Sequence, residues 1–258
     1  MNEHSGTTAV TVDGFDVIEC KPCGFKHIMP LIAQEELDRF YRTEFYESEK
    51  PEYFAAAEED KEWWMGTYSL YYSLLEKHTN GRRLLDIGSG PGYFLDAGAA
   101  RGWEVVGIEP SPAAVRYAAS RGLKVVNDFF TPARAAELGR FDAIALSLVL
   151  EHVPDPQNVI ARAAAMLNPG GVLLVVAPND FNPLQQLLLA DGGYTPWWVV
   201  PRHHLNYFSV ESLQALLAQQ GVPAVAAGVS YPMEFFLLSG RNYVGHPEVG
   251  KVCHKERK

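Results

Sequence analysis

A glycine turn with an acid on either side is the first stretch of the chain whose residues could do chemistry. It reads LLDIGSGPGYFLDAGAARGWEVVGIEPS, residues 84–111, with glycines at alternate positions. This spacing differs from the G-x-G-x-x-G of dinucleotide sites, and Pro91 removes one backbone N–H donor. A pyrophosphate in the turn would also meet the carboxylate of Asp86, a costly contact in a site shielded from water. The turn therefore disfavours a dinucleotide.

The two acids favour a cationic nucleoside instead. Asp86 stands at the end of a predicted strand beside the turn, where its carboxylate would attract a positive charge. Glu109 ends the next predicted strand, about 20 residues beyond the glycines, where an acid accepts the hydroxyl groups of a ribose. S-Adenosylmethionine fits both, because it has a sulfonium, an ammonium and a ribose but no phosphate. The alternative is a tight strand-to-helix turn that binds no ligand.

The elements that must position these acids alternate strictly between strand and helix from Arg82 onward. Short apolar runs typical of buried parallel strands are RRLLDIG, EVVGIE, LKVVND, FDAIALS and GVLLVVAP. Helix starts that pair a capping oxygen with a following proline are Ser111-Pro112, Thr131-Pro132 and Asp155-Pro156. The pattern predicts an α/β fold with a doubly wound parallel sheet and right-handed crossovers.

Other elements flank this core on both sides. Short β-like pieces in residues 1–30 predict a small appendage, and helical spacing of apolar residues predicts helices over 33–46 and 61–78. We therefore expect an N-terminal appendage and helical cap over 1–80 and a ligand-binding domain over 81–258. A long irregular stretch, 179–208, is expected as an inserted substrate lid. The helix SVESLQALLAQQG follows it, and PAVAAGVS and MEFFLLS predict a terminal hairpin.

Composition narrows the classes of protein. The net charge of -9 has the wrong sign for a protein that binds mainly phosphate backbones. The first residues lack the features of a signal peptide, and no apolar stretch is long enough to span a bilayer. Three cysteines argue against a disulfide framework. We expect a cytoplasmic protein that binds neither nucleic acid nor membrane.

Five motifs, in order and spacing, resemble the class I S-adenosylmethionine-dependent methyltransferases. They are LLDIGSGPG, VVGIEPS, VVND, FDAIALSLVLEHVPDP and LNPGGVLLVVAPN. The similarity covers about residues 82–239 and is nearest to the small-molecule branch of quinone-biosynthesis and sugar- or antibiotic-tailoring enzymes. It implies a seven-stranded Rossmann-like sheet of order 3-2-1-4-5-7-6 with the last strand antiparallel, in agreement with the predicted hairpin.

The resemblance also implies which residues bind the cofactor. Glu109 should bind the ribose hydroxyls, Asp128 should accept from the adenine amino group, and Phe129 should pack on the ring. Alternatively, Asp128 is a helix cap or a solvated loop acid. The full set implied is Asp86, Gly88, Ser89, Gly90, Tyr93, Glu109, Pro110, Asp128, Phe129, Ser147, Leu148 and His152.

The methyl acceptor should be bound by the stretch 179–208, which is rich in aromatic residues. These aromatics would wall an apolar or sugar-like substrate, or equally form a small core of their own. His203 and His204 are the predicted catalytic bases, since histidine titrates in the useful pH range; otherwise one of them pins the loop through a backbone bond. His152 is a rival base, although a structural or cofactor-pocket role suits it better.

Two further groups have open roles. Trp63, Trp64 and Tyr68 would cap the sulfonium by cation–π attraction, or form an ordinary buried stripe. Cys20 and Cys23 look like half of a zinc site. A closed site needs four ligands, and His27, Cys253 and His254 would contribute only if the tail folded back, so no metal is predicted.

We therefore predict a methyltransferase that uses S-adenosylmethionine to methylate a hydroxyl or amine of a small molecule. A non-catalytic homologue that binds the cofactor and a partner is the alternative. An NAD-dependent oxidoreductase fails on glycine spacing and on Asp86. Nucleic-acid methylation is disfavoured by the stretch SLVLEHV. It has no Asn-Pro-Pro-aromatic element, which would serve methylation of an exocyclic base amine, and no cysteine, which would attack carbon 5 of a pyrimidine. Protein methylation, the acceptor atom and the oligomeric state stay open.

Overall fold

The chain divides into two compact units, each described here by itself. The computed structural model describes residues 4–190 and 193–256. One unit comprises residues 31–177 and 220–222, and the other comprises 1–30, 178–219 and 223–258. This division places residues 31–80 in the same unit as the central sheet, whereas the predicted domains divide at 80/81, which stays a prediction.

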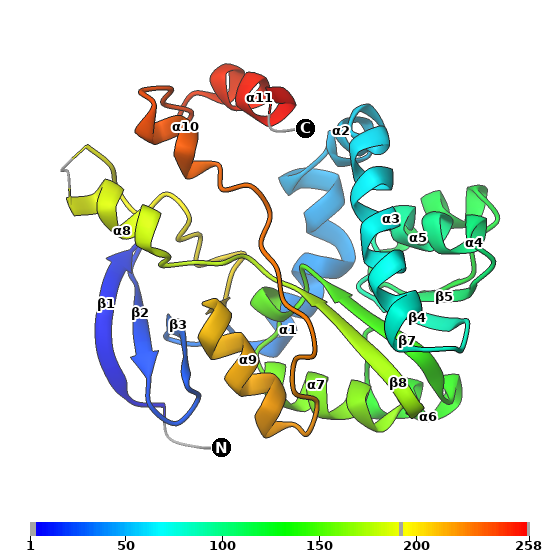
Figure 1. Cartoon of the computed structure of the whole chain (residues 1–258). Helices are drawn as coiled ribbons and strands as arrows, with labels where there is room; N and C mark the ends of the chain where they lie inside the picture. The colour runs from blue at the N-terminus through cyan, green and yellow to red at the C-terminus, as the bar shows by residue number, and fades with distance from the viewer. Residues whose placement is uncertain (1–3, 191–192, 257–258) are drawn as a thin grey trace. The chain divides into compact units, whose positions relative to one another are not determined.

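A five-stranded sheet organises the unit of residues 31–177. Its order is β6-β5-β4-β7-β8 and every pairing is parallel (Figure 1). The strands are β4 (Arg83–Ile87), β5 (Glu104–Ile108), β6 (Val125–Val126), β7 (Phe141–Ser147) and β8 (Leu167–Val176). In strand number this is 3-2-1-4-5, so the predicted parallel α/β sheet is confirmed for these five strands.

Helices cover both faces of this sheet. The crossover helices are α4 (Tyr93–Ala100), α5 (Pro112–Ser120), α6 (Pro132–Leu138) and α7 (Pro156–Ala165). Helices α4 and α5 lie on one face, and α6 and α7 on the other (Figure 1). The side chains of Ser111, Thr131 and Asp155 accept backbone N–H bonds at the starts of α5, α6 and α7, as predicted from their Ser-Pro, Thr-Pro and Asp-Pro pairs.

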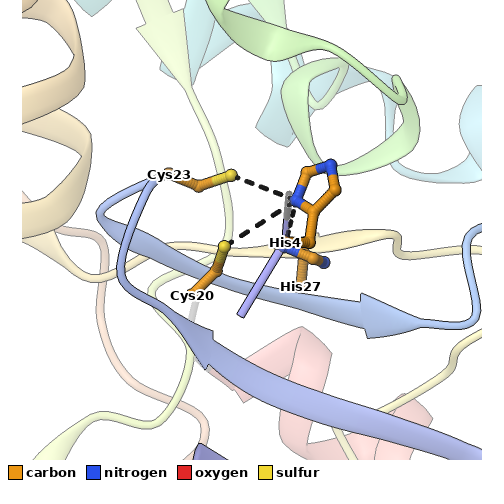
Figure 2. A group of neighbouring side chains, drawn as sticks. All are labelled: His4, Cys20, Cys23 and His27. Carbon is orange, nitrogen blue, oxygen red and sulfur yellow. Dashed lines mark hydrogen bonds between the residues drawn. The ribbon is translucent and has the colours of Figure 1, made fainter. Parts of the chain in front are cut away.

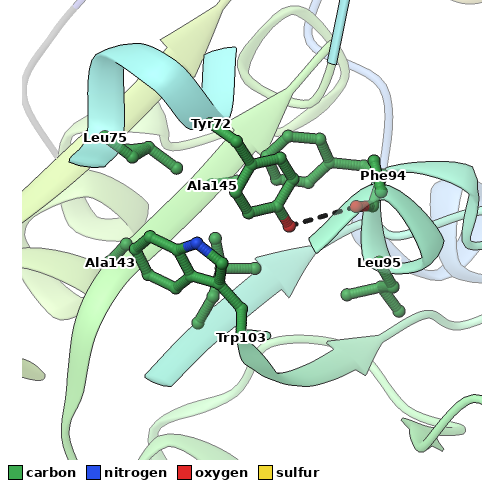
Figure 3. Close-up of a cluster of buried hydrophobic side chains, with 9 residues drawn as sticks. Tyr72, Leu75, Phe94, Leu95, Trp103, Ala143 and Ala145 are labelled. Carbon is green, nitrogen blue, oxygen red and sulfur yellow. Dashed lines mark hydrogen bonds between the residues drawn. The ribbon is translucent and has the colours of Figure 1, made fainter. Parts of the chain in front are cut away.

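An aromatic cluster fills the face of the sheet under α3 (Lys61–His78), whose predicted bounds are confirmed. Tyr72 of α3 stacks on Phe94 of α4, with ring centroids 4.6 Å apart, and donates its hydroxyl to the Phe94 carbonyl at 3.0 Å (Figure 3). Trp103 closes the cluster against small residues of β7. Burial of these side chains ties α3 to the sheet.

The helices before α3 differ from the single helix predicted over 33–46. They are α1 (Gln34–Arg39), η1 (Phe40–Glu49) and α2 (Tyr53–Glu59). The element η1 is a π-helix, and Lys50 donates its N–H to the Phe45 carbonyl five residues back. Such wide turns are rare, and those that do occur frequently lie at functional sites. The apolar spacing alone did not distinguish this turn from an α-helix.

The second unit is built on an antiparallel sheet of order β1-β2-β3-β9. Its strands are β1 (Gly6–Val12), β2 (Phe15–Cys20), β3 (Phe25–Met29) and β9 (Asn206–Tyr207), and its helices are α8 (Pro183–Ala190), α9 (Val210–Gln219), α10 (Glu234–Leu238) and α11 (Pro247–Glu256). The stretch 179–208 is therefore more ordered than predicted, since it supplies both α8 and β9. Residues 191–192 of it lie outside the described part.

The predicted terminal hairpin, and with it the seven-stranded order, is wrong for the described residues. Residues 223–230 form no strand and are exposed, and MEFFLLS contributes helix α10. The small side chains of PAVAAGVS offer little area to bury against a neighbouring strand. The four-residue apolar run FFLL fits a short buried helix as well as a strand, so its periodicity could not distinguish the two. Among the described residues, no helix combines the length and the apolar composition needed to cross a bilayer.

Candidate active site

A cavity of about 770 Å³ opens at the carboxyl ends of β4, β5 and β7. Its volume lies within the range of small-molecule and cofactor sites. Every residue predicted to bind the cofactor lines it: Asp86, Gly88, Ser89, Gly90, Tyr93, Glu109, Pro110, Asp128, Phe129, Ser147, Leu148 and His152. The fold thus brings this set together at the edge where ligands of parallel α/β sheets bind.

The glycine turn forms the floor of the cavity. Its backbone conformation and its close neighbours both require residues without a side chain at Gly88 and Gly90. Gly88 has a φ of 70°, and a Cβ there would lie 2.7 Å from Cγ2 of Val149. Gly90 has a φ of 49° and faces the Tyr46 hydroxyl, which a Cβ would approach to 3.2 Å. These positions leave the backbone open to a ligand.

Two buried carboxylates share this floor. Glu109 accepts the N–H groups of Gly90 at 3.0 Å and Ser111 at 2.9 Å, which fixes its orientation. Burial raises the pKa of Glu109 to about 7 although both bonds oppose the shift. Burial, and then the nearby charge of Glu109, hold the pKa of Asp86 well above its usual range. A positively charged ligand would favour the ionised form of both acids.

Asp128 and Phe129 line the cavity beside two arginines. The Asp128 carboxylate accepts from Arg134 Nε at 2.8 Å and from Arg42 Nη2 at 3.2 Å, and the pKa of Asp128 is lowered mainly by Arg134. The Arg42 guanidinium also lies over the Phe129 ring, 4.7 Å from its centroid. Asp128 is therefore part of an ion-pair network rather than a helix cap, and the cap of α6 is Thr131.

Ser147 is the last residue of β7, and Leu148 and His152 follow the strand. Leu148 adopts a φ of 56°, uncommon for a residue other than glycine, and its N–H donates to the Val176 carbonyl at 2.8 Å. His152 lies in a short 3₁₀ turn, with its Nδ1 2.9 Å from the Tyr41 hydroxyl. This contact ties the π-helix η1 to the loop after β7.

Tyr93 lines the cavity, but its hydroxyl is used elsewhere. It donates to Oε2 of Glu58 at 2.7 Å and lies 2.9 Å from the Tyr117 hydroxyl. The Arg121 guanidinium covers its ring at 4.2 Å. Tyr93 can therefore offer a ligand its ring but not a free hydroxyl.

An aromatic wall from the N-terminal helices is the part of the cavity that the sequence analysis missed. The aromatic residues that line it are Tyr41, Phe45, Tyr46 and Tyr53. Phe45 and Tyr46 follow Tyr41 by four and five residues on the wide turns of η1. Of the tryptophans and tyrosine considered for the sulfonium, Trp64 and Tyr68 line the cavity and Trp63 is not among the lining residues.

The predicted bases His203 and His204 belong to the other unit, so their catalytic role stays a prediction. Both backbone N–H groups donate to the Val200 carbonyl at 2.9 Å, which places them in one tight turn.

The same unit contains a buried acid that the sequence analysis did not single out. Burial raises the pKa of Asp180 to about 7, and the negative charge of Glu234 adds to the effect.

Comparison with known proteins fits this geometry. Residues 46–226 match the family model of the methyltransferase domain. The chain is 32% identical to the ubiquinone biosynthesis O-methyltransferase of Bordetella avium over 64% of this chain and 73% of that protein. It is 34% identical to the enzyme of the same name from Caulobacter vibrioides, over 62% and 66% respectively. The chain thus spans about two thirds of the length of these relatives.

Solved structures share the fold. A SAM-dependent methyltransferase from Archaeoglobus fulgidus aligns with a TM-score of 0.51 at 19% identity, over 66% of this chain and 73% of that one. The plantazolicin methyltransferase BpumL in complex with SAH aligns with a TM-score of 0.52 at 16% identity, over 81% and 87%. At such identities the likeness concerns the fold alone.

The family match covers most of the chain and includes β4 to β8 together with the η1 residues from Tyr46 onward. The predicted enzyme class, an S-adenosylmethionine-dependent methyltransferase, is confirmed at the level of the family. The chain belongs to the methyltransferase domain family.

Proposed function

We propose that the cavity binds S-adenosylmethionine and that the chain transfers its methyl group to an oxygen of a small molecule. The observation that carries the proposal is the pair Asp86 and Glu109, two buried acids with raised pKa values on the wall of one cavity. Such a pair favours a cationic ligand, and the fixed Glu109 carboxylate suits a pair of ribose hydroxyls. The relatives named above support an oxygen acceptor.

The cavity suits this cofactor on three counts. Its volume of about 770 Å³ accommodates an adenosine joined to an amino acid with room for part of an acceptor. The turn at Gly88 and Gly90 presents backbone where a side chain would obstruct. Trp64 and Tyr68, stacked with centroids 5.5 Å apart, present aromatic faces of the kind that attract a sulfonium.

When bound, the cofactor supplies a methyl carbon already activated for displacement. The residues of the chain then act by positioning, which contributes up to about 7–11 kcal/mol in favourable cases. Asp86 and Glu109 orient the nucleoside, and the aromatic wall of η1 excludes water. A hydroxyl acceptor must also lose a proton. His152 is the base candidate on this cavity, with its ring oriented by Tyr41.

Several earlier expectations remain proposals. These are the catalytic role of His203 and His204, the role of 179–208 as a substrate lid, the helical cap formed by the helices between 34 and 78, and the cytoplasmic location. Each needs its own test.

Calorimetric titration with S-adenosylmethionine and S-adenosylhomocysteine tests the proposal. We expect the wild type to bind both compounds. Asp86→Asn and Glu109→Gln should bind them at least tenfold more weakly, a loss of about 1.4 kcal/mol of binding free energy. Glu104→Gln is the matched control, because Glu104 begins β5 and pairs with Arg83 at the opposite end of the strand. A folded wild type that binds neither compound would refute the proposal.

The acceptor is tested separately by following S-adenosylhomocysteine formation with phenol and catechol compounds. Turnover that falls strongly in His152→Gln while cofactor binding is kept would assign the base to His152. Cofactor binding without turnover on any oxygen or nitrogen acceptor would instead favour the non-catalytic homologue.

A further inference from the structure

Four side chains with metal-binding atoms converge beside the N-terminal sheet. They are His4, Cys20, Cys23 and His27, and their ligand atoms all lie within 4.8 Å of one another (Figure 2). All four belong to the same unit. None belongs to the cavity that we propose for the cofactor.

The spacing of these atoms matches a tetrahedral site. The Nδ1 atom of His4 lies 3.0 Å from His27 Nε2, 3.4 Å from Cys23 Sγ and 3.7 Å from Cys20 Sγ. Zinc bonds of roughly 2.0–2.3 Å to nitrogen and sulfur place neighbouring ligand atoms of a tetrahedron about 3.3–3.8 Å apart. The three distances from His4 thus lie within a few tenths of an ångström of the tetrahedral values, and the remaining pairs of ligand atoms lie within 4.8 Å.

The local fold explains why the atoms meet. Gly24, with a φ of 78°, donates its N–H to the Cys20 carbonyl at 2.9 Å and closes the turn between β2 and β3. This turn brings Cys23 back beside Cys20. His27 pairs with Ile18 on the neighbouring strand, two residues from Cys20 and on the same face.

The first ligand is delivered from the start of the chain. Lys21 donates its N–H to the Ser5 carbonyl at 3.0 Å, so the residue before Ser5 lies next to the cysteines. His4 is thereby joined to a hairpin that begins eleven residues later in the sequence, at Phe15. A bound ion at this point would fasten the N-terminal segment to β2 and β3.

The imidazole of His27 is already set for a metal. Its Nδ1 lies 2.9 Å from the Ile28 carbonyl, a bond in which the ring must donate, so Nε2 carries the lone pair that faces the cluster. This backbone bond is the outer contact that ligating histidines usually make. His27 is 2% exposed and Cys20 3%, so both ligand positions are shielded from water.

We propose that His4, Cys20, Cys23 and His27 bind one Zn²⁺ as a structural site. Two thiolates and two neutral imidazoles balance the charge of the ion, and the two thiol protons pass to solvent on binding. Four protein ligands leave no open position, which is the arrangement of structural rather than catalytic zinc. The sequence analysis considered His27, Cys253 and His254 as further ligands, but not His4.

The first measurement is the metal content of the full chain, expressed with added zinc and freed of any affinity tag. Mass spectrometry of the elements should find about one zinc per chain, and less than about a tenth of that in Cys20→Ser and Cys23→Ser. Cys253→Ser is the matched control, because it removes a buried cysteine outside the cluster and should keep the zinc.

The second measurement needs no variant to fold. Cobalt(II) added to chelator-treated wild type should give the intense visible bands of a tetrahedral site and a thiolate charge-transfer band. Zinc should abolish both at one equivalent, and it should restore the thermal midpoint that chelation lowers. His4→Gln should weaken the visible bands while both thiolates remain.

Three results would overturn the proposal. One is folded wild type with neither bound zinc nor a thiolate–cobalt spectrum. Another is a zinc content that Cys20→Ser leaves unchanged. The last is a Cys20–Cys23 disulfide in protein prepared under reducing conditions.

Discussion

The Glu109 carboxylate accepts a hydrogen bond from the backbone N–H of Gly90 at 3.0 Å, across 19 residues of sequence. The bond joins the loop after β5 to the glycine turn after β4, because the two strands are parallel neighbours. It places an acid that titrates near neutral pH against the backbone that we propose to hold the cofactor. Stability and binding are therefore linked through one carboxyl group.

The stability of the ligand-free protein should fall as pH rises from about 4.5 to about 7. The pKa of Glu109 is about 7 in the folded chain against 4.5 for an ordinary glutamate. Between these values the folded state holds more protons than the unfolded state, so this contribution is complete below pH 4.5 and lost above pH 7. It amounts to about 3 kcal/mol, as an order of magnitude.

Urea unfolding at pH 5 and pH 8 measures this effect. Relative to the wild type, Glu109→Gln should gain about 2.5 kcal/mol of unfolding free energy on going from pH 5 to pH 8, because the variant has no carboxyl to ionise. Glu104→Gln, at the exposed start of β5, should follow the wild type. Parallel pH profiles for Glu109→Gln and the wild type would contradict the raised pKa.

Affinity for S-adenosylmethionine should run in the opposite direction. The proposed ligand requires ionised Glu109, so binding should weaken as pH falls below about 7, by up to tenfold for each further pH unit. Titrations in buffers of different ionisation enthalpy should show proton release near neutral pH. Proton uptake, or an affinity that does not change between pH 5 and pH 8, would argue against an ionised Glu109 in the complex.

The turn should tolerate alanine poorly at Gly88. A Cβ there would lie 2.7 Å from Val149 Cγ2 at a φ of 70°, and we expect a loss of about 3 kcal/mol or more. Gly102→Ala is the matched control. Its φ of 80° imposes the same backbone strain, about 1–2 kcal/mol, but a Cβ there has no neighbour within 4 Å.

Denaturant unfolding of both variants separates collision from strain. Adding Val149→Ala to Gly88→Ala should restore the part of the unfolding free energy that is lost through the collision with Val149. The cost of Val149→Ala alone is subtracted first. Equal losses at Gly88 and Gly102 would show that the turn can shift to admit a side chain.

The hydroxyl of Tyr72 should contribute about 1 kcal/mol to stability through its buried bond to the Phe94 carbonyl. Tyr72→Phe removes only this bond and keeps the stacked ring shown in Figure 3. Tyr71→Phe, one residue earlier on α3, is the control and should change the unfolding free energy less. No difference between the two variants would show that the bond has no net effect.

The sequence predicted most of what makes the central sheet. Continuous apolar runs such as FDAIALS specify buried parallel strands, and Ser-Pro, Thr-Pro and Asp-Pro pairs specify helix starts. Both are local properties, decided by residues within one turn or one strand. Because the carboxyl ends of parallel strands lie at one edge of the sheet, the motifs after β4, β5, β6 and β7 must come together at that edge.

The failures share a different physical cause. The run MEFFLLS is too short for its periodicity to separate helix from strand, and burial of Phe236 and Leu237 decides for the helix α10. The π-helix η1 was missed because its stripe of aromatics also fits α-helical spacing. Neither outcome is encoded within the segment itself.

The sequence by itself determined the chemistry that we propose for the main site, since Asp86, Glu109 and the glycines between them disfavour a pyrophosphate and favour a cationic nucleoside. Only the tertiary structure decided which distant side chains complete each site. Tyr41 and Tyr46 reach the cofactor cavity from a helix about 40 residues before the glycine turn, and His4 reaches Cys20 and Cys23 through the pairing of the first strands. Contacts of this kind depend on packing and on chain reversals between elements, which residue spacing along the sequence does not record.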